Sequence, residues 1–234
     1  MSILFVGTSH VSSESIAQIR GAINSFSPNI VCAELDRGRL AALINKQKPH
    51  YPLNLVFKLG VGGYLFALVA STVQRKLGNL VGTTPGEDML TAVKYAREKK
   101  ISVALIDQPI EKTMQRISES FGARVIFAMI KDFFSSLLFP KRTRQRLGLD
   151  NFSLNRAPSE KFVRAALQHL ESNYPSLYSA LLVERNTYMV DRIMRIVNPN
   201  PESRVLVVVG AAHVPGMQEE LRKRYKVTSE RLFV

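Results

Sequence analysis

The sequence predicts an α/β fold in which a mixed central sheet is flanked by helices, with a helical insertion between the second and third strands. Two continuous apolar runs, residues 3–6 and 205–209, are rich in β-branched residues, and each is followed by glycine. This pattern is typical of a strand buried on both faces. Near the start, a strand, a helix and a second strand fit into roughly 30 residues, the size of a βαβ unit.

Three predicted strands lie in the first half of the chain. The first is followed by Ser12 and Glu14, a serine cap with an acidic first turn, which predicts a helix that runs to about Asn24. The second strand covers residues 29–35. The third covers residues 101–107 and follows a predicted helix over residues 85–100.

The rest of the chain completes a single predicted domain, residues 1–234. The fourth strand begins at Arg204, and a short run at residues 225–227 predicts an additional edge strand. The helical insertion is expected at about residues 50–85, and an apolar-basic helical segment at about residues 120–147.

Residues 53–73 raise the question of a membrane span, because roughly 20 apolar residues would cross a bilayer. Lys58 interrupts this stretch, as do three glycines in its first half, and polar residues follow it. The pattern favours a buried or interfacial helix, or a helical hairpin, over a span.

Composition limits the other possibilities. With 234 residues, 46% of them hydrophobic, the chain can bury a full core. Its single cysteine, Cys32, excludes an intramolecular disulfide and a cysteine-built zinc site. Because no basic segment precedes the first apolar run, no signal peptide is recognised, and we expect a cytoplasmic protein.

A formal net charge of +13 favours an anionic partner. Basic residues gather at 141–146 and 222–226, and the first cluster follows the apolar segment 125–140. That order is typical of an interfacial helix whose charged end meets lipid headgroups, which would make the protein peripheral to an anionic membrane. The other interpretation is a core or homodimer-interface helix beside a solvated basic loop. Nucleic acid is disfavoured as a partner because no nucleic-acid-binding motif is present.

A Gly-x-x-His-Val motif follows both the first and the fourth strand and supplies His10 and His213. Glu34 and Asp107 stand at the carboxyl ends of the other two strands. In open α/β sheets, ligands bind in the crevice beyond these ends, so we expect one shared site. Each residue alone is ordinary for a loop or a helix cap. Two imidazoles and one or two carboxylates together match a catalytic metal site with an open position for water.

The donor types leave the metal open. Zinc takes two histidines and a carboxylate, whereas additional oxygen ligands favour manganese or cobalt. Glu87 and Asp107 are the candidate general bases. As an alternative to catalysis, Glu87 would stabilise the start of a helix. Arg39, Arg116 and Arg185 could bind a carboxylate or stabilise an oxyanion, although arginines in such segments are usually solvated or paired.

Five motifs, in order along nearly the whole chain, resemble the TraB family, which is related to PrgY, the pheromone-shutdown protein, and more distantly to GumN and the Tiki proteases. They are Gly7-Thr8-Ser9-His10, Glu34-Leu35-Asp36-Arg37-Gly38-Arg39, Pro85-Gly86-Glu87-Asp88, Glu184-Arg185-Asn186 and Gly210-Ala211-Ala212-His213. The family often has Asp-Arg-Asp where this chain has Asp107-Gln108-Pro109, and Glu-Arg-Asp where it has Glu184-Arg185-Asn186.

The resemblance to Tiki implies a metal-dependent peptidase that uses manganese or cobalt. On this chain the implied site is His10, His213, Glu34 and Arg39. The prediction is therefore a hydrolase whose metal is held by His10, Glu34 and His213, with Glu87 or Asp107 as the base and Arg39 or Arg185 as the cation at the reacting centre. Ser9, Arg116 and Asn186 are the predicted substrate contacts, and the substrate would be a peptide or protein.

Two other kinds of function remain open from the sequence. One is a non-catalytic protein, associated with the membrane, that sequesters a peptide signal in the same crevice, as the resemblance to PrgY allows. The other is a membrane-surface interaction protein that uses the apolar-basic segments.

Overall fold

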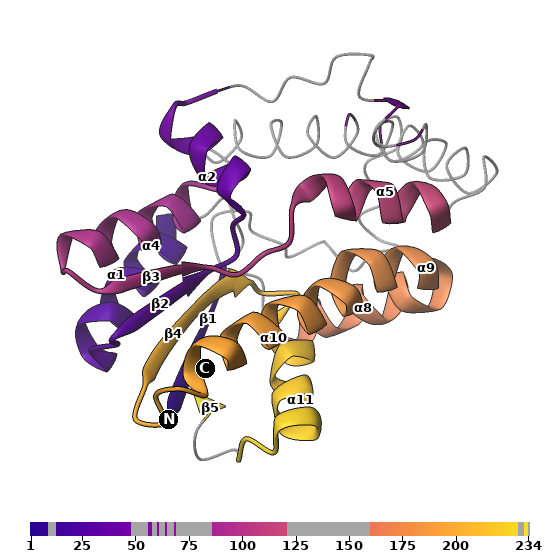
Figure 1. Cartoon of the computed structure of the whole chain (residues 1–234). Coiled ribbons are helices and arrows are strands. Elements are labelled where there is room, and N and C mark those ends of the chain that lie inside the picture. Colours follow the sequence, from indigo (N-terminus) through magenta and orange to yellow (C-terminus); the bar gives the residue numbers. More distant parts are fainter. Residues whose placement is uncertain are drawn as a thin grey trace.

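The protein is represented by a computed structural model, which describes residues 1–8, 13–47, 56–57, 60, 64, 68, 86–120, 160–228 and 232–233. Within these residues a twisted sheet lies between two groups of helices (Figure 1). The strands follow the order β3-β2-β4-β1-β5 across the sheet. They are β1 (Ser2–Thr8), β2 (Ile30–Ala33), β3 (Ser102–Leu105), β4 (Arg204–Gly210) and β5 (Leu232–Phe233).

The α/β class is confirmed, and every pair of neighbouring described strands is parallel, where a mixed sheet was expected. Parallel pairing follows from helices that return the chain to the edge where each strand began. In the register of the central pair, Thr8 lies opposite Gly210. The carboxyl ends of β1 and β4 therefore lie side by side.

Helices cover both faces of the sheet. One group, α1 and α4, contributes Ile19 and Met89 to a core with the even-numbered residues of β4. The other group, α10 and α11, contributes Met189 and Met217 to a core with the odd-numbered residues of β4. The described helices are α1 (Ser13–Phe26), α2 (Arg37–Ile44), α4 (Glu87–Glu98), α5 (Ile110–Ser120), α8 (Glu160–Asn173), α9 (Pro175–Tyr178), α10 (Glu184–Val197) and α11 (Val214–Tyr225), and a π-helix, η2 (Ser179–Val183), joins α9 to α10.

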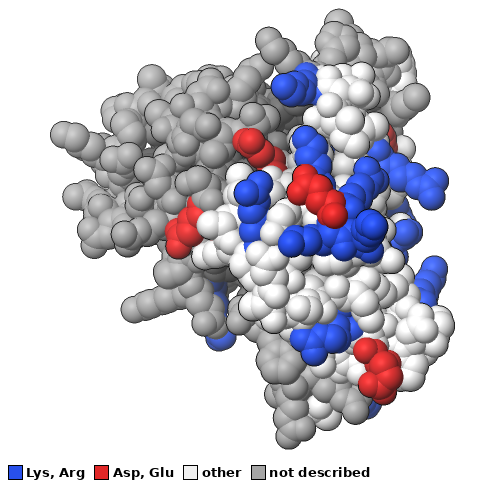
Figure 2. Space-filling model, turned by 90° about the vertical axis from the view of Figure 1, so that its left-hand side faces the viewer, with Lys and Arg blue, Asp and Glu red and all other residues white. Residues whose placement is uncertain are grey.

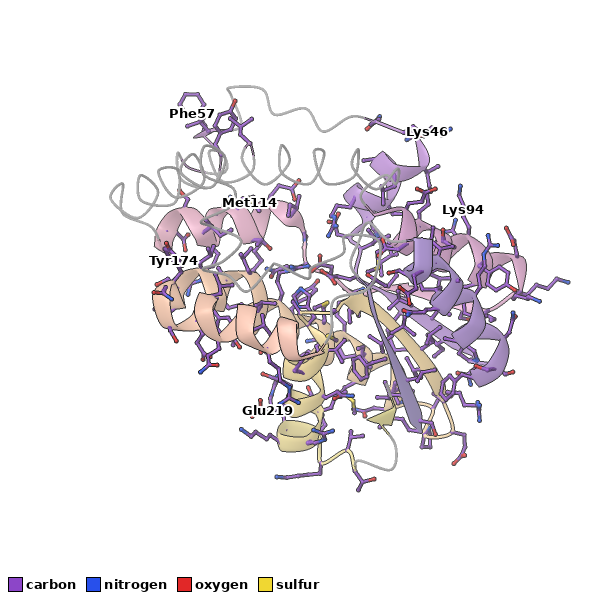
Figure 3. The ribbon with its side chains drawn as sticks, turned by 180° about the vertical axis from the view of Figure 1, so that it is seen from behind. Lys46, Phe57, Lys94, Met114, Tyr174 and Glu219 are labelled. Carbon is purple, nitrogen blue, oxygen red and sulfur yellow. The ribbon has the colours of Figure 1, made fainter. Side chains whose placement is uncertain are left out.

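Seen from behind, α5 and α8 to α11 form a layer beside the sheet (Figure 3). Met114 of α5 is buried, Tyr174 precedes α9, and Glu219 lies on α11. Full burial of a methionine side chain contributes about 1.5–3 kcal/mol, so the burial of Met114 helps to stabilise this layer.

The predicted edge strand at residues 225–227 is wrong. Helix α11 extends to Tyr225, and Lys226 ends it in the left-handed conformation with φ 55°. The edge position beside β1 is taken by β5. Tyr225 is the last residue of the helix and Lys226 is its C-cap, so the three-residue run forms the end of the helix and not a strand.

The predicted insertion at about 50–85 and the apolar-basic segment at about 120–147 lie almost entirely outside the described residues. Within the part of the chain that the structure describes, no helix combines the length and apolar character needed to cross a bilayer.

Basic side chains are numerous on the side of the molecule that carries α1 and α4 (Figure 2). The aromatic ring of Tyr95 lies under two of them, with Arg20 Cζ 5.4 Å and Lys99 Nζ 5.6 Å from its centroid. The exposed cations on these two helices and in the turn after α4 are Arg20, Lys94, Arg97, Lys99 and Lys100.

Candidate functional site

Glu34 follows β2 directly and turns its carboxylate into the protein at the carboxyl edge of the sheet. Its backbone N–H donates to the Val208 carbonyl at 3.0 Å, which prolongs the strand ladder by one residue. Its Oε2 accepts the Gly210 N–H at 2.6 Å. Only 3% of the side chain is exposed. Both the main chain and the carboxylate of Glu34 are therefore bonded to the backbone of β4.

Asp107 lies beyond β3 and accepts from two arginines. Nε and Nη2 of Arg185 lie 3.1 Å from Oδ1 and 2.8 Å from Oδ2, and Arg39 Nη1 lies 3.1 Å from Oδ2. Arg185 Nη2 also donates to Glu34 Oε1. The two carboxylates and two guanidinium groups thus form one network at the crevice that the strand ends predicted.

Arg185 is the second residue of α10, in the first turn after the π-helix η2. Its Nη1 donates to the Leu181 carbonyl within η2 at 3.2 Å. Burial works against the charge of Arg185, but the carboxylates of Glu34 and Asp107 outweigh it and raise the pKa of the guanidinium above its ordinary value. Arg185 is therefore a permanently charged, largely buried cation. Arg39, by contrast, has a side chain that is 32% exposed.

His213 lies at the N-terminal end of α11, next to Glu34. Its Nε2 is 3.3 Å from Glu34 Oε1, and its Nδ1 is 2.7 Å from Asn186 Oδ1. The imidazole is 5% exposed. The structure therefore brings together Glu34, Asp107, Arg39, Arg185, Asn186 and His213, all of which were predicted site residues.

Arg116 and Glu87 lie outside this group of residues. Arg116 Nε donates to both oxygens of Glu184 at 3.0 Å, and this pairing raises the pKa of the guanidinium. Its side chain is 51% exposed. Glu87 is exposed in the first turn of α4, on the face of the sheet opposite α10 and α11. Their predicted roles as substrate contact and base stay predictions.

Ser9 and His10 lie outside the described residues, so one of the three predicted metal ligands has no described position. Among the residues that are described, no group of three or more His, Cys, Asp or Glu side chains is arranged to hold a metal ion. The described part of the predicted ligand set is the pair Glu34 and His213.

Three features of the site had no role in the sequence analysis. The Gly210 N–H anchors Glu34, and Gly216 makes room for Asn186, because a Cβ there would lie 2.3 Å from Asn186 Nδ2. The π-helix η2 precedes Arg185 and Asn186 directly. The two glycines stand within or beside the second Gly-x-x-His motif, which is the only sequence signal for them. The sequence of η2 reads as an ordinary helix.

Comparison with known proteins identifies a family whose model matches nearly the whole chain. The model of the TraB/PrgY/gumN family matches residues 1–229. The uncharacterized protein MJ1365 of Methanocaldococcus jannaschii is 32% identical over 225 residues, which cover 94% of this chain and 53% of that protein. The chain therefore spans about half the length of this relative. An erythromycin esterase, EreC, solved as a mutant in its open conformation, matches with a TM-score of 0.37 and 15% identity over 95% of this chain and 67% of its own.

Proposed function

The chain belongs to the TraB/PrgY/gumN family, and on this premise we propose that it is a metal-dependent hydrolase that cleaves a peptide bond in a peptide or protein substrate. The single observation that carries the proposal is the contact between His213 and Glu34. Two side chains of metal-ligand type, from opposite ends of the chain, meet in a buried crevice at the carboxyl edge of the sheet.

The spacing of the two ligand atoms suits a shared metal ion. Metal bonds to imidazole nitrogen and carboxylate oxygen are about 2.0–2.2 Å long, so two ligands of one ion lie roughly 3 Å apart. The distance from His213 Nε2 to Glu34 Oε1 is 3.3 Å. Manganese, cobalt or zinc would fit these donors, and His10 is the proposed third ligand.

Arg185 competes for the same carboxylate, because its Nη2 donates to Glu34 Oε1. It holds Asp107 with two nitrogens, however, so it can release Glu34 and keep its principal partner. The other oxygen of Glu34 stays bound to Gly210. The residues of the site therefore fit a metal once a single ion-pair contact is given up.

When bound, the metal would lower the pKa of a water molecule and make hydroxide available near neutral pH. The residues around it have distinct roles in the proposal. Asp107 accepts from both arginines and fixes their orientation. Arg39, the more exposed of the two, is the cation that a substrate carbonyl or carboxylate can reach. Of the two predicted bases, Asp107 belongs to this network, whereas Glu87 lies on the other face of the sheet, so Asp107 is the base in this proposal.

A second candidate is a protein that binds a peptide without cleaving it. The contact between Arg185 and Glu34 favours it, because this ion pair already neutralises the carboxylate that a metal needs. In that case the crevice would hold a peptide through Arg39 alone, and His213 would be a structural residue.

Metal titration of the metal-stripped protein by calorimetry tests the proposal. Manganese, cobalt and zinc would be titrated into the wild type and into His10→Ala, His213→Ala and, as a matched control, His169→Ala on α8. We expect one equivalent to bind the wild type and the control, and both other variants to lose it. Metal-supported cleavage of a peptide library should follow the same pattern. Binding that survives both substitutions, or peptide binding without turnover with all three metals, would overturn the hydrolase proposal.

A further inference from the structure

We infer that Asn186 is a positioning residue that holds the imidazole proton of His213 on Nδ1 and so directs the free Nε2 lone pair at Glu34. The inference rests on the proposed function, because it concerns how one proposed metal ligand is prepared. Asn186 was predicted from the sequence as a substrate contact, whereas the structure places its amide against His213.

The first argument comes from the buried contact itself. Asn186 Oδ1 lies 2.7 Å from His213 Nδ1, and the two residues are only 5% and 4% exposed. An amide oxygen accepts hydrogen bonds and cannot donate them, so this contact requires a proton on Nδ1. A neutral imidazole carries one ring proton, which leaves Nε2 as the acceptor atom.

The second observation concerns the two ends of the amide. Nδ2 lies beside Gly216, and Oδ1 faces the imidazole of His213. Asn186 also lines a surface hollow with Glu219, Glu220, Lys223 and Arg224, in which the two carboxylates pair with the two cations. The acceptor oxygen is therefore the amide atom that meets His213.

Gly216 makes this arrangement possible. A Cβ built there would lie 2.3 Å from Asn186 Nδ2, closer than any real side-chain contact, so even alanine would push the amide away. Gly216 belongs to the first turns of α11, which begins one residue after His213. His213, the proposed ligand, and Gly216, which leaves space for Asn186, therefore lie in the same short segment.

The consequence appears at the other ring nitrogen. With the proton on Nδ1, the Nε2 lone pair faces Glu34 Oε1 at 3.3 Å, so the two acceptor atoms are placed where one bound cation could contact both. Without Asn186, the proton would move to Nε2 and be donated to Glu34, which would occupy both ligand atoms. Asn186 thus prevents a hydrogen bond from His213 Nε2 to Glu34 Oε1, the two proposed ligand atoms. Metal-ligating histidines commonly have their second nitrogen held in this way.

The test is nitrogen-resolved NMR on the metal-free, histidine-labelled full chain, at a pH above the ordinary histidine pKa of about 6.5. The His213 signals are assigned by their loss in His213→Gln. We expect the wild type to carry its proton on Nδ1. In Asn186→Leu the proton should move to Nε2, whereas Asn186→Asp, which keeps an acceptor, should restore the Nδ1 form.

Gly216→Ala should also move the His213 proton to Nε2. The added Cβ displaces the Asn186 amide from His213, although the asparagine itself is still present. Its matched control is Gly21→Ala on α1, where a Cβ meets nothing within 4 Å and no change in the His213 spectrum is expected. Metal affinity should fall roughly 10- to 100-fold in Asn186→Leu and in Gly216→Ala.

Two results would overturn the inference: a proton on Nε2 in the wild type, or an unchanged Nδ1 form in Asn186→Leu. The wild-type spectrum decides the first without depending on the folding of any variant. A failure of the proposed function would give another result: His213 would show the expected Nδ1 and Nε2 forms in the wild type and the variants, but the protein would neither bind metal nor cleave peptides.

Discussion

Arg185 and Asp107 form a two-point ion pair, with Nε 3.1 Å from Oδ1 and Nη2 2.8 Å from Oδ2. The pair joins helix α10 to the end of β3, and only 14% and 3% of the two side chains are exposed. Two parallel hydrogen bonds fix the guanidinium in one plane. Arg185 therefore reaches Glu34 from a fixed direction.

Replacement of Asp107 by asparagine should destabilise the protein by about 3–5 kcal/mol, because it leaves the buried charge of Arg185 with Glu34 as its remaining carboxylate partner at the site. Urea unfolding measures the change. Glu184→Gln is the control, since it removes a carboxylate that pairs with the exposed Arg116 and should therefore destabilise the protein much less. Equal losses in the two variants would show that burial of the Arg185 pair has no special weight.

Glu34→Gln should abolish metal binding while the fold is retained. Glutamine keeps an oxygen that can accept the Gly210 N–H, but it lacks the negative charge that a divalent ion needs. Calorimetric titration with manganese, cobalt and zinc measures the loss. The companion variant Glu87→Gln changes an exposed carboxylate on the other face of the sheet and should bind metal like the wild type. A metal affinity that is unchanged in Glu34→Gln would remove Glu34 from the ligand set.

Arg39→Ala should raise KM for peptide hydrolysis roughly 10- to 100-fold, the loss expected for one hydrogen bond to a charged group. Its stability should change little, because its partner, Asp107, keeps the ion pair with Arg185. Steady-state kinetics measure the effect, and Arg37→Ala, an exposed arginine of the same helix, provides the comparison. If the loss falls entirely on kcat and KM is unchanged, Arg39 acts in the transition state and does not bind the ground-state substrate.

Cys32 should resist thiol reagents in the folded protein at about pH 8.5, the ordinary pKa of a cysteine thiol. Burial raises its pKa to about 12, although Arg192 works in the opposite direction. Because the folded pKa is the higher one, the thiol stabilises the fold at low pH, and this contribution is lost as the pH rises from about 9 towards about 12. Urea unfolding in that range should show a smaller pH dependence in Cys32→Ala. Rapid modification without denaturant would contradict the burial.

The sheet was predictable because its strands carry strong local signals. Runs of β-branched residues identify β1 and β4, and the acidic residues after β2 and β3 mark the carboxyl edge. Parallel strands bring such ends together, so Glu34, Asp107 and His213 could be assigned to one crevice before their contacts were known. The α1 helix begins at Ser13, within the predicted serine cap.

The partners of these residues could not be predicted in the same way. Arg185 and Asn186 lie on a helix whose direction depends on the π-turn in η2, which adds one residue and turns all later side chains by about 100° around the axis. The residues of η2 give no local sign of that extra residue. Asn186 was therefore recognised as part of a motif, while its contact with His213 depends on long-range packing.

The position of β4 affects how the protein folds as it is made. Although β4 is the fourth strand along the chain, it lies between β1 and β2 and pairs with both. During synthesis, β1 and β2 therefore have no strand between them until residues 204–210 have left the ribosome. Until then, the apolar faces of α1 and α4 pack against an incomplete sheet. Contacts between such distant segments form slowly, and the waiting strands have exposed edges in the meantime. The nascent chain should therefore remain prone to aggregation until residues 204–210 have been synthesised.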